Sequence, residues 1–503
     1  MLRKARRIIA AIVFLLVTLL FLDFTGTLHL WFGWLVKIQL VPAILAVNIV
    51  VLTVLALVTF LFGRVYCSVI CPLGIMQDGI SNISGRRRGK KNRFRYSKPK
   101  KWLRYGFLAL FIIGLIAGVS VIVSLFDPYA NFGRIASNLL APLYRLGNNL
   151  LVWVAERVDS YMFYPTEVWI KSWAVFGVSA VVLTIIGILS WKNGRIYCNV
   201  VCPVGTFLGF ISRFSIFRPA FIKDKCKKCG LCEKNCKSSC IDSKNLTIDQ
   251  SRCVPCFNCI DKCKFGGIKY TSRKKVQTAK KEKEATTGKS DMTYDESRRN
   301  FLSLIGMMTI AGTVQAQKLH VDGGLAVIED KKVPVRKTPV IPPGAQSLRN
   351  LNSHCTACQL CVSACPNNVL RPSEKLATFM QPEMSFERGF CRPECTECSN
   401  VCPNKAIIPI SAAEKTAISI GQAVWIKENC VVTTNHLQCE SCERHCPTGA
   451  IHLVAIDPSD AASLKVPVVF NELCIGCGAC EHHCPARPFS AIYVEGNVRH
   501  HTV

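Results

Sequence analysis

The stretch that decides the fold is GRVYCSVICPLG at residues 63–74, and it returns as GRIYCNVVCPVG at residues 194–205. Each copy directly follows a long apolar run and carries two cysteines, separated by three residues, ahead of a proline. Similarity at one fixed offset indicates a duplicated structural unit. We therefore expect two similar halves, each built from a pair of helices.

Four apolar runs accompany these copies, at residues 8–24, 38–62, 102–126 and 172–191. Each run is about long enough to cross a hydrocarbon core of ~30 Å as a helix. Half of the 503 residues are apolar and only 19% are charged, which excludes a disordered chain. The mean hydropathy of +0.26 agrees with membrane segments. Residues 1–215 are therefore predicted to form a transmembrane four-helix bundle made of two parallel hairpin repeats.

The basic residues predict the orientation of this bundle. The chain has 62 Lys and Arg against 33 Asp and Glu, a net charge of +29. Residues 63–101 hold eleven Lys and Arg and one acid, whereas residues 127–171 hold four of each sign. Basic loops stay on the cytoplasmic side of a membrane. The N-terminus and the chain that follows residue 192 are therefore expected on the cytoplasmic side of a bacterial inner membrane. A nucleic-acid patch is disfavoured because apolar spans flank the basic loop, and a cleaved signal peptide because no A-x-A-like site follows the first run.

The cysteines of the two copies are candidate cofactor ligands, namely Cys67, Cys71, Cys198 and Cys202. Residues i and i+4 share one face of a helix, and both copies end at the same membrane surface. The four thiols could therefore converge on a redox or metal site between the halves. The alternative is that they are small packing residues at a helix end. The double occurrence favours a bound redox centre, whose identity the sequence does not give.

Residues 216–270 are predicted to form a cytoplasmic ferredoxin domain with two clusters. Two runs have the spacing Cys-x2-Cys-x2-Cys-x3-Cys, which is typical of [4Fe–4S] ligation, and the fourth thiol usually ligates the neighbouring cluster. The first run holds Cys226, Cys229, Cys232 and Cys236, and the second holds Cys253, Cys256, Cys259 and Cys263. A zinc site fits poorly because it needs a longer spacer between its pairs. Neither run ends in Cys-Pro, and the nearby Cys240 could replace Cys236 as a ligand.

A linker and an export signal are expected next. Residues 271–297 are polar and rich in Lys, Glu and Thr, which is typical of a disordered linker. Residues 298–317 begin with Arg298-Arg299 and continue into a short apolar stretch, which predicts a twin-arginine signal or anchor. Such a signal exports folded, cofactor-loaded proteins. The alternative is an ordinary amphipathic helix that happens to begin with two arginines.

Residues 318–503 are predicted to form a periplasmic domain with four clusters. Sixteen cysteines fall in four groups, each ending in Cys-Pro, and the helix-then-strand rhythm predicts a bacterial-ferredoxin-like α+β fold. The groups are Cys355, Cys358, Cys361 and Cys365; Cys391, Cys395, Cys398 and Cys402; Cys430, Cys439, Cys442 and Cys446; and Cys474, Cys477, Cys480 and Cys484. A disulfide framework would suit an external location but does not explain the shared ending. The expected total is six [4Fe–4S] clusters.

In this order of motifs, residues 1–270 resemble the NapH-type membrane quinol dehydrogenases, and residues 295–503 resemble the NapG-type periplasmic ferredoxins. The resemblance implies a fusion of two subunits that pass electrons from quinol to a periplasmic reductase, with a nitrate-reductase-like system as the best-known partner. Related membrane proteins serve nitrous oxide reductase, as in the NosR type, or amine dehydrogenase maturation.

The sequence thus predicts a membrane-bound electron-transfer protein of the quinol dehydrogenase type. Its expected partners are quinol, the twin-arginine export machinery and a periplasmic reductase or cytochrome. The alternative is an assembly or maturation factor that supplies electrons to a periplasmic metalloenzyme. A barrier of ~30 Å is too wide for one electron hop, so quinone or a cofactor on the repeat cysteines must bridge it. Asp23, His29 and Asp127 lie near outer span ends, where a proton acceptor is useful, but ordinary interfacial groups are commoner there.

Overall fold

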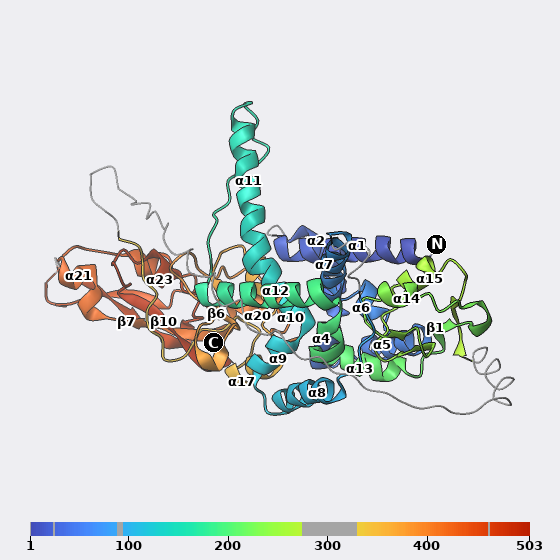
Figure 1. Ribbon diagram of the computed structural model, residues 1–503. Helices are drawn as coiled ribbons and strands as arrows, with labels where there is room; N and C mark the ends of the chain where they lie inside the picture. Colours follow the sequence, from blue (N-terminus) through green and yellow to red (C-terminus); the bar gives the residue numbers. More distant parts are fainter. Residues whose placement is uncertain (1, 24–25, 88–93, 274–328, 461–462) are drawn as a thin grey trace, which may run out of the picture.

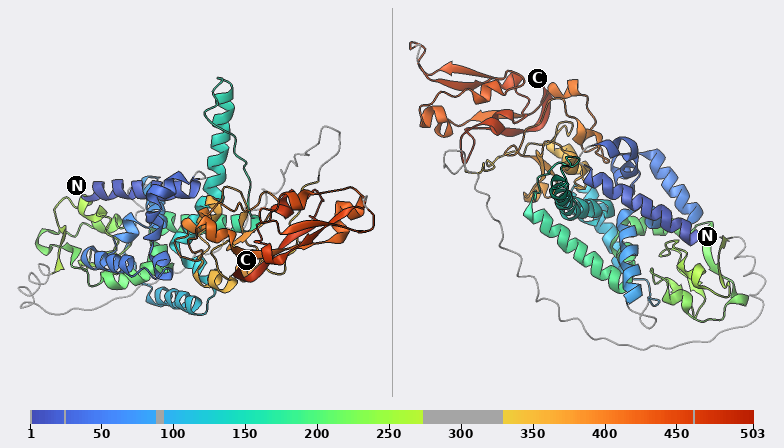
Figure 2. Two further views of the ribbon diagram at one scale, coloured as in Figure 1. Left: turned by 180° about the vertical axis from the view of Figure 1, so that it is seen from behind. Right: turned by 90° about the horizontal axis from the view of Figure 1, so that it is seen from above.

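The computed structural model describes residues 2–23, 26–87, 94–273, 329–460 and 463–503 (Figure 1). The predicted linker beyond Arg273 and the predicted export signal at 298–317 lie outside the described residues. Two ferredoxin-like units lie at opposite ends of a set of helices, as Figure 2 shows from two directions. The smaller unit lies beside the N-terminus, and the larger one contains the C-terminus.

Two described helices are long and apolar enough to cross a membrane, α1 (Leu2–Leu22) and α12 (Trp173–Asn193). The other two expected spans are each interrupted. The run 38–62 forms α4 (Leu40–Leu45) and α5 (Ile49–Phe62), and the run 102–126 forms α8 (Lys101–Ile116) and α9 (Ser120–Phe126). In the described part of the chain, four continuous spans are therefore not present, and the prediction holds without a break only for α1 and α12.

Local residues explain both interruptions. Asn48 caps α5 by accepting a hydrogen bond from Val51 N at 3.2 Å, and Val47 before it has a φ of 52°. A side-chain cap of this kind starts a new helix instead of continuing the old one. Gly118 has a φ of +69° between α8 and α9, a conformation that glycine adopts without a Cβ clash.

Shorter helices fill the space between these segments. They are α2 (Thr27–Phe32), α3 (Trp34–Lys37), α6 (Tyr66–Val69), α7 (Pro72–Arg87), α10 (Pro128–Ile135), the π-helical turn η1 (Ala136–Leu140), α11 (Ala141–Glu156), the π-helical turn η2 (Tyr197–Val201) and α13 (Pro203–Ser212). All eight residues of α10 are buried, and α7 packs against both α10 and α12. Helix α11 projects away from the body of the molecule (Figure 1). Its many exposed apolar side chains suit the plane of a membrane surface.

The smaller ferredoxin-like unit is built on one long strand pair. β1 (Phe217–Phe221) pairs antiparallel with β4 (Ile268–Ser272), and β2 (Ile241–Asp242) pairs with β3 (Thr247–Ile248). The unit also contains η3 (Lys223–Lys225), α14 (Leu231–Lys234) and α15 (Asn258–Lys262). An ion pair between Arg3 and Asp261 attaches it to the beginning of α1.

The larger unit has a part near the helices and a distal part. The near part holds α17 (Leu348–His354), α18 (Leu360–Ala364), β5 (Leu370–Pro372), η4 (Leu376–Thr378), β6 (Pro382–Met384), α19 (Glu397–Asn400) and α20 (Ala412–Thr416). The distal part holds β7 (Ile418–Trp425), η5 (Lys427–Asn429), α21 (Val431–Thr434), α22 (Ser441–Arg444), β8 (Ile451–Ala455), β9 (Lys465–Val469), η6 (Asn471–Leu473), α23 (Ala479–His483) and β10 (Ile492–Thr502). Three antiparallel pairs form, β5 with β6, β7 with β10, and β8 with β9.

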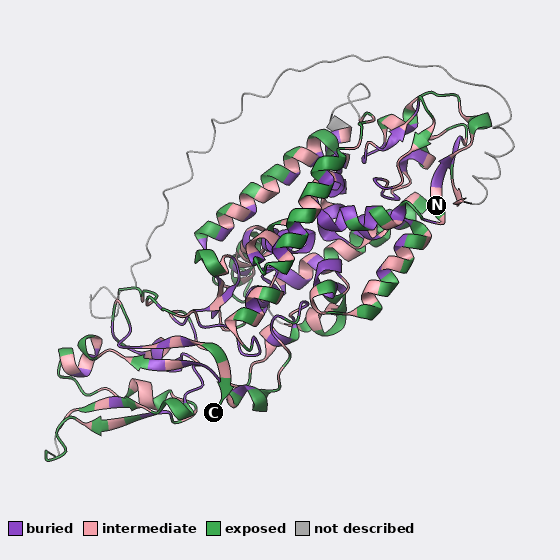
Figure 3. Ribbon diagram, turned by 90° about the horizontal axis from the view of Figure 1, so that it is seen from below, coloured by how far each residue is buried: buried purple, intermediate pink, exposed green. Residues whose placement is uncertain are grey.

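Polar contacts attach the near part to the helices. Asn138 of η1 donates to the side chain of Gln359 at 2.6 Å, and Ser137 lies 2.8 Å from the hydroxyl of Ser363. One apolar core runs without a break from α1 through the two sequence repeats to α18. Buried residues are concentrated along this axis, whereas the outer faces of the helices are largely exposed (Figure 3).

Candidate functional site

The two sequence repeats form one pseudo-symmetric centre, in which each copy supplies an arginine to the other. Arg64 of the first copy donates to the backbone oxygen of Cys198 at 3.0 Å. Arg195 of the second copy donates to the backbone oxygen of Cys67 at 2.5 Å. Both arginines are 0% exposed. A buried guanidinium needs acceptors in a fixed geometry, so this exchange fixes the two cysteine turns against each other.

The chain between the paired cysteines makes a turn wider than an α-helix. The backbone N–H of Cys71 donates to Tyr66 O, and that of Cys202 donates to Tyr197 O, each at 3.0 Å and five residues back. Such π-type turns often occur at functional sites. The expectation that each pair lies at i and i+4 of one α-helix is therefore wrong, since α7 and α13 begin only after the second cysteine.

The four repeat thiols lie near one another in the core. Cys67, Cys71, Cys198 and Cys202 are all 3–4% exposed and lie close enough to interact electrostatically with one another. Glycine is needed beside them, because a Cβ on Gly74 would overlap the backbone oxygen of Cys67. Gly205 stands in the same relation to Cys198. Each copy thus positions its two buried thiols with the same close contact between a glycine and a cysteine carbonyl.

A buried carboxylate links this centre to the smaller ferredoxin-like unit. Asp78 of α7 forms ion pairs with Arg6 and Arg195, each at 2.8 Å, and with Lys237 at 3.5 Å. Burial alone would raise the pKa of Asp78, but Arg195 and Lys237 bring it well below its usual range. Asp78 also interacts electrostatically with Cys256. The sequence offered one signal for this residue, since it is the single acid within the basic segment 63–101.

In the smaller unit, a thiol of the first run faces the second run. Cys236 interacts electrostatically with Cys253, Cys256 and Cys259. This placement agrees with the sharing of the fourth ligand that is usual in two-cluster ferredoxins. The sulfur of Cys240 lies 3.5 Å from that of Cys236 and also contacts Cys253. Either thiol is therefore placed to be the fourth ligand, and the alternative raised by the sequence stays open.

In the near part of the larger unit, each of the two cysteine groups places its last thiol beside the other group. Cys402 of the second group lies beside three thiols of the first, those of Cys355, Cys358 and Cys361. Cys365 of the first group lies beside Cys391 and Cys398 of the second. Burial raises the pKa of Cys355 to about 12. A cluster that binds these thiols must therefore displace their protons.

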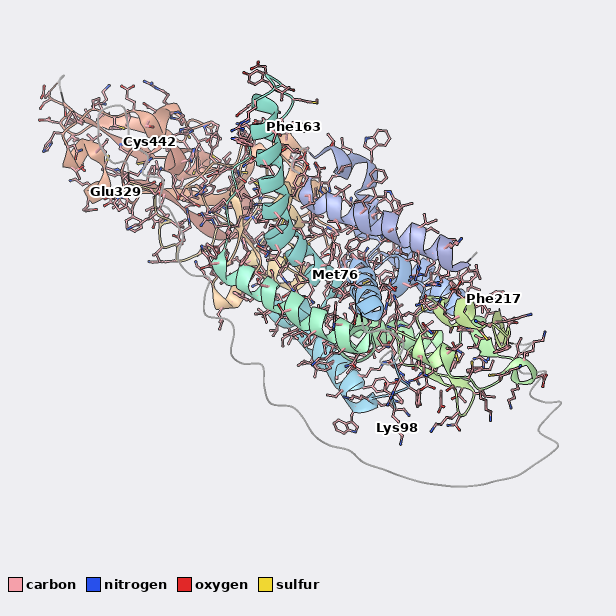
Figure 4. The ribbon with its side chains drawn as sticks, turned by 45° about the horizontal axis from the view of Figure 1, so that its top comes forward. Met76, Lys98, Phe163, Phe217, Glu329 and Cys442 are labelled. Atoms are coloured by element: carbon pink, nitrogen blue, oxygen red, sulfur yellow. The ribbon has the colours of Figure 1, made fainter. Side chains whose placement is uncertain are left out.

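The distal part repeats this arrangement less completely. Cys446 interacts electrostatically with Cys474, Cys477 and Cys480, and Cys484 interacts with Cys442. Cys442 lies at the end of the molecule farthest from the smaller unit (Figure 4). Cys430 comes from the long-spaced third group and is buried in the same apolar cluster as these thiols.

One helix bridges the repeat centre and the larger unit. Tyr129 of α10 lies near Cys358 and Cys402 of the larger unit and also near Tyr66. Tyr66 directly precedes Cys67, and its hydroxyl donates to the side chain of Gln39 at 2.8 Å. Asp127 caps α10 by accepting hydrogen bonds from two backbone N–H groups, at 3.1 and 3.2 Å. It therefore has a structural role as a helix cap.

The donor sets fit iron–sulfur cubanes better than single ions. Within the described residues, no three His, Cys, Asp or Glu side chains converge as they would around one ion. A zinc ion gathers all its ligands at ~2.0–2.3 Å, whereas a cubane takes one thiolate on each of four separate iron atoms. The crosswise pairing of the thiols points in the same direction. The residues present therefore fit [4Fe–4S] groups.

Comparisons with known families agree with this chemistry. A model described as a 4Fe-4S binding domain matches residues 44–91 and again residues 173–224, once in each half of the duplicated region. A 4Fe-4S dicluster domain matches residues 435–487, and a further 4Fe-4S binding domain matches residues 352–371. The predicted iron–sulfur class is thereby confirmed.

Relatives of known name are ferredoxin-type or electron-transport proteins. The methylamine utilization ferredoxin-type protein MauM of Methylophilus methylotrophus is 34% identical over 164 residues, which cover 30% of this chain and 69% of MauM. The putative electron transport protein YccM of Escherichia coli is 23% identical over 245 residues, 48% of this chain and 60% of YccM. The ferredoxin-type protein NapH of Haemophilus influenzae is 22% identical over 220 residues, 42% of this chain and 63% of NapH.

The chain covers less than two thirds of YccM and of NapH. The match to MauM is both closer in identity and more complete over that protein's length. Two candidate membrane helices and the similarity to NapH agree with a membrane protein. On the match to MauM, together with the repeated 4Fe-4S domains, the chain belongs to the family of ferredoxin-type iron–sulfur electron-transfer proteins.

Proposed function

We propose that this protein takes electrons from membrane quinol and passes them through cysteine-bound clusters to a periplasmic acceptor. In this proposal, six [4Fe–4S] clusters occupy the predicted ligand sets, two on the cytoplasmic side and four in the exported unit. Cys67, Cys71, Cys198 and Cys202 hold a further redox centre between them. The preferred acceptor is a periplasmic reductase of the nitrate-reductase-like kind, with export by the twin-arginine pathway.

The observation that carries the proposal is the unbroken series of cysteine sites along the molecule. Asp78 contacts both the ferredoxin loop at Lys237 and the repeat centre at Arg195. Tyr129 then lies between the repeat centre and Cys358 of the larger unit. In this proposal, a redox centre on the four repeat thiols lies between the two units, so that no single electron transfer has to cover the whole barrier of ~30 Å.

The chain's own residues would tune and protect the clusters. A bound [4Fe–4S] cluster accepts and donates one electron at a time, and its potential depends on hydrogen bonds to its sulfurs and on solvent exposure. Backbone N–H groups donate to the thiol sulfurs of Cys263, Cys446 and Cys484 at 3.1 to 3.3 Å. Such hydrogen bonds to the ligand sulfurs stabilise the more negative, reduced state of a bound cluster, whereas removal of the cluster from water opposes it.

A second function is favoured by the similarity to a methylamine utilization protein. In this alternative, the same series of clusters supplies electrons while a periplasmic metalloenzyme is matured. The two functions differ in what a deletion strain contains. Loss of an electron donor leaves an enzyme that holds its cofactor but is not reduced, whereas loss of a maturation factor leaves an enzyme without its finished cofactor.

The bridging role of the repeat centre is tested with Cys71→Ser. Short-chain ubiquinol is added anaerobically to the full-length protein in detergent, and cluster reduction is followed by electron paramagnetic resonance. Wild type should show reduction of clusters in both units, whereas Cys71→Ser should leave one unit oxidised although all clusters are present. Ile70→Val, a neighbouring change that keeps every thiol, is the matched control.

Two results would contradict the proposal. Complete reduction of Cys71→Ser at the wild-type rate would show that the repeat thiols are packing residues. Failure of wild type to be reduced by quinol, while dithionite reduces it, would show that quinol is not the donor.

A further inference from the structure

A cavity of about 400 Å³ lies between the outer end of the helices and the larger ferredoxin-like unit. Helices α2 and α3 form one wall with His29, Leu30 and Trp34, and the short helix α19 forms the other with Glu397 and Val401. This volume lies in the range of small-molecule sites. Cys398 and Cys402, both assigned to clusters under the proposed function, directly follow Glu397 and Val401 in the chain.

The mouth of the cavity suits a ligand that arrives from lipid. Leu30 is 86% exposed and Trp34 is 56% exposed, and Trp31 beside them is 78% exposed. These side chains follow the end of α1, one of the two helices that could span a membrane. Tryptophan is enriched at the membrane–water boundary, where one part of the ring is apolar and the other polar. A lipid-soluble molecule could therefore enter without crossing water.

His29 is one of the polar residues that line the cavity, together with Thr27, Lys37, Glu397 and Asn400. Its Nε2 lies 2.9 Å from the backbone oxygen of Leu20. Because a carbonyl oxygen can only accept, Nε2 must carry the hydrogen, and in the neutral ring Nδ1 then holds a lone pair. Among the residues that the structure describes, this buried Nδ1 has no hydrogen-bond partner. A buried acceptor without a partner is costly, and a ligand hydroxyl would satisfy it if the ring turns Nδ1 toward the cavity that His29 lines.

Burial keeps the His29 ring neutral in spite of the carboxylates around it. Burial lowers the pKa of His29, and the carboxylates of Asp23 and Glu397 offset only part of this effect. Asp23 accepts hydrogen bonds from the backbone N–H groups of Gly26 and Leu28, at 3.1 and 2.9 Å, which directs its charge into the loop. A neutral imidazole with a fixed tautomer is a proton acceptor ready for use.

We propose that this cavity binds the quinol headgroup and that Nδ1 of His29 accepts its hydroxyl protons. The inference rests on the proposed function, because it requires that quinol be the donor. Oxidation of the quinol releases two electrons and two protons. The electrons go singly to two oxidised iron–sulfur clusters of the larger unit, and the protons leave one after the other through His29 to water on the outer side. The quinol thereby becomes quinone.

Binding is tested on the full-length protein with a photoreactive azido-benzoquinone. Illumination should attach the label to peptides that contain residues 26–37 or 397–401, and excess unlabelled quinone should prevent it. Leu30→Trp, which places a larger side chain at the mouth, should abolish the labelling. A label that maps to any other part of the chain would overturn the assignment of the site.

The role of His29 is tested separately with His29→Gln. Glutamine keeps an N–H that can reach Leu20 O but has no basic nitrogen, so quinone binding should stay within about twofold of wild type while reduction of the clusters by quinol slows about 10²-fold or more. Reduction by dithionite needs no proton acceptor and should be unchanged. His452→Gln, at an exposed histidine of the larger unit, is the matched control.

Three outcomes distinguish an error in the binding site from an error in the proposed function. If quinol reduces His29→Gln at the wild-type rate, quinol is the donor but His29 is not the proton acceptor. If quinol reduces wild type while the label maps elsewhere, the site is wrong and the proposed function survives. If quinol does not reduce wild type at all, both are wrong.

Discussion

Replacing Asp78 with asparagine should destabilise the protein more than any surface change. The carboxylate is 4% exposed and is paired with three cations, of which Arg195 is 0% exposed and Lys237 3% exposed. The amide of asparagine removes the negative charge and leaves those cations buried without compensation. Removing one partner of a buried ion pair costs about 3–5 kcal/mol. For a domain of about 150–250 residues, such a loss of stability corresponds to a fall in Tm of roughly 6–20 °C.

Thermal unfolding of the full-length protein in detergent measures this effect, with Asp159→Asn as the control at an exposed aspartate. The control should stay within about 0.5 kcal/mol of wild type. Adding Lys237→Met to Asp78→Asn should recover part of the loss, because one uncompensated cation is removed. A loss below about 1 kcal/mol for Asp78→Asn would refute the reasoning, since it would show that water reaches the cations.

The difference in stability between wild type and Asp78→Asn should depend on pH in a way that the pKa of Asp78 determines. The pKa of Asp78 is lowered in the folded protein, so its contribution is fully present above the ordinary carboxyl pKa of about 3.9 and is lost as the pH falls below it. The difference in stability between wild type and Asp78→Asn should therefore be constant from about pH 8 to pH 5. It should shrink only below about pH 4, and a difference that shrinks already near pH 6 would contradict the assignment.

Three further predictions concern the repeats, the export signal and the clusters. Gly74→Ala should lower the yield of folded protein, because the new Cβ overlaps the backbone oxygen of Cys67. Gly79→Ala in the same helix meets open space and should be neutral or stabilising by about 0.4–1 kcal/mol. Equal thermal stabilities of the two variants would refute this prediction. Changing Arg298-Arg299 to Lys-Lys should keep a reporter fused after residue 503 in the cytoplasm, and an exported reporter would exclude a twin-arginine signal. Iron analysis of anaerobically purified protein should give roughly 24 atoms per chain for six cubanes, and a value near eight would remove the four clusters of the larger unit.

The iron–sulfur class could be predicted from the sequence because the proposed ligands are local. In the compact groups three cysteines lie in one short loop, so the spacing from Cys355 to Cys361 already indicates the chemistry. The same holds for the duplicated cysteine turns, whose similarity is visible without any structure. Which distant thiol completes each set follows from the fold of two motifs around each other, as the position of Cys402 shows.

Other features depend on contacts that no local pattern contains. The breaks in two expected spans come from Asn48 and Gly118, which are single residues inside otherwise apolar runs. The exchange of Arg64 and Arg195 joins positions in different repeats, and hydropathy gives no sign of it. His29 is one histidine in a loop, and its unpaired nitrogen is visible only once Leu20 and the cavity are in place.

The exchanged arginines also bear on how the duplicated unit arose in evolution. A contact in which each half gives the other the same group is what two identical subunits make across a twofold axis. A single ancestral unit of this kind could have formed the thiol centre only by pairing with a second copy of itself. Joining the two copies in one polypeptide then freed each to diverge, and the lone acid at position 78, opposite Gly209 in the second copy, is one such divergence.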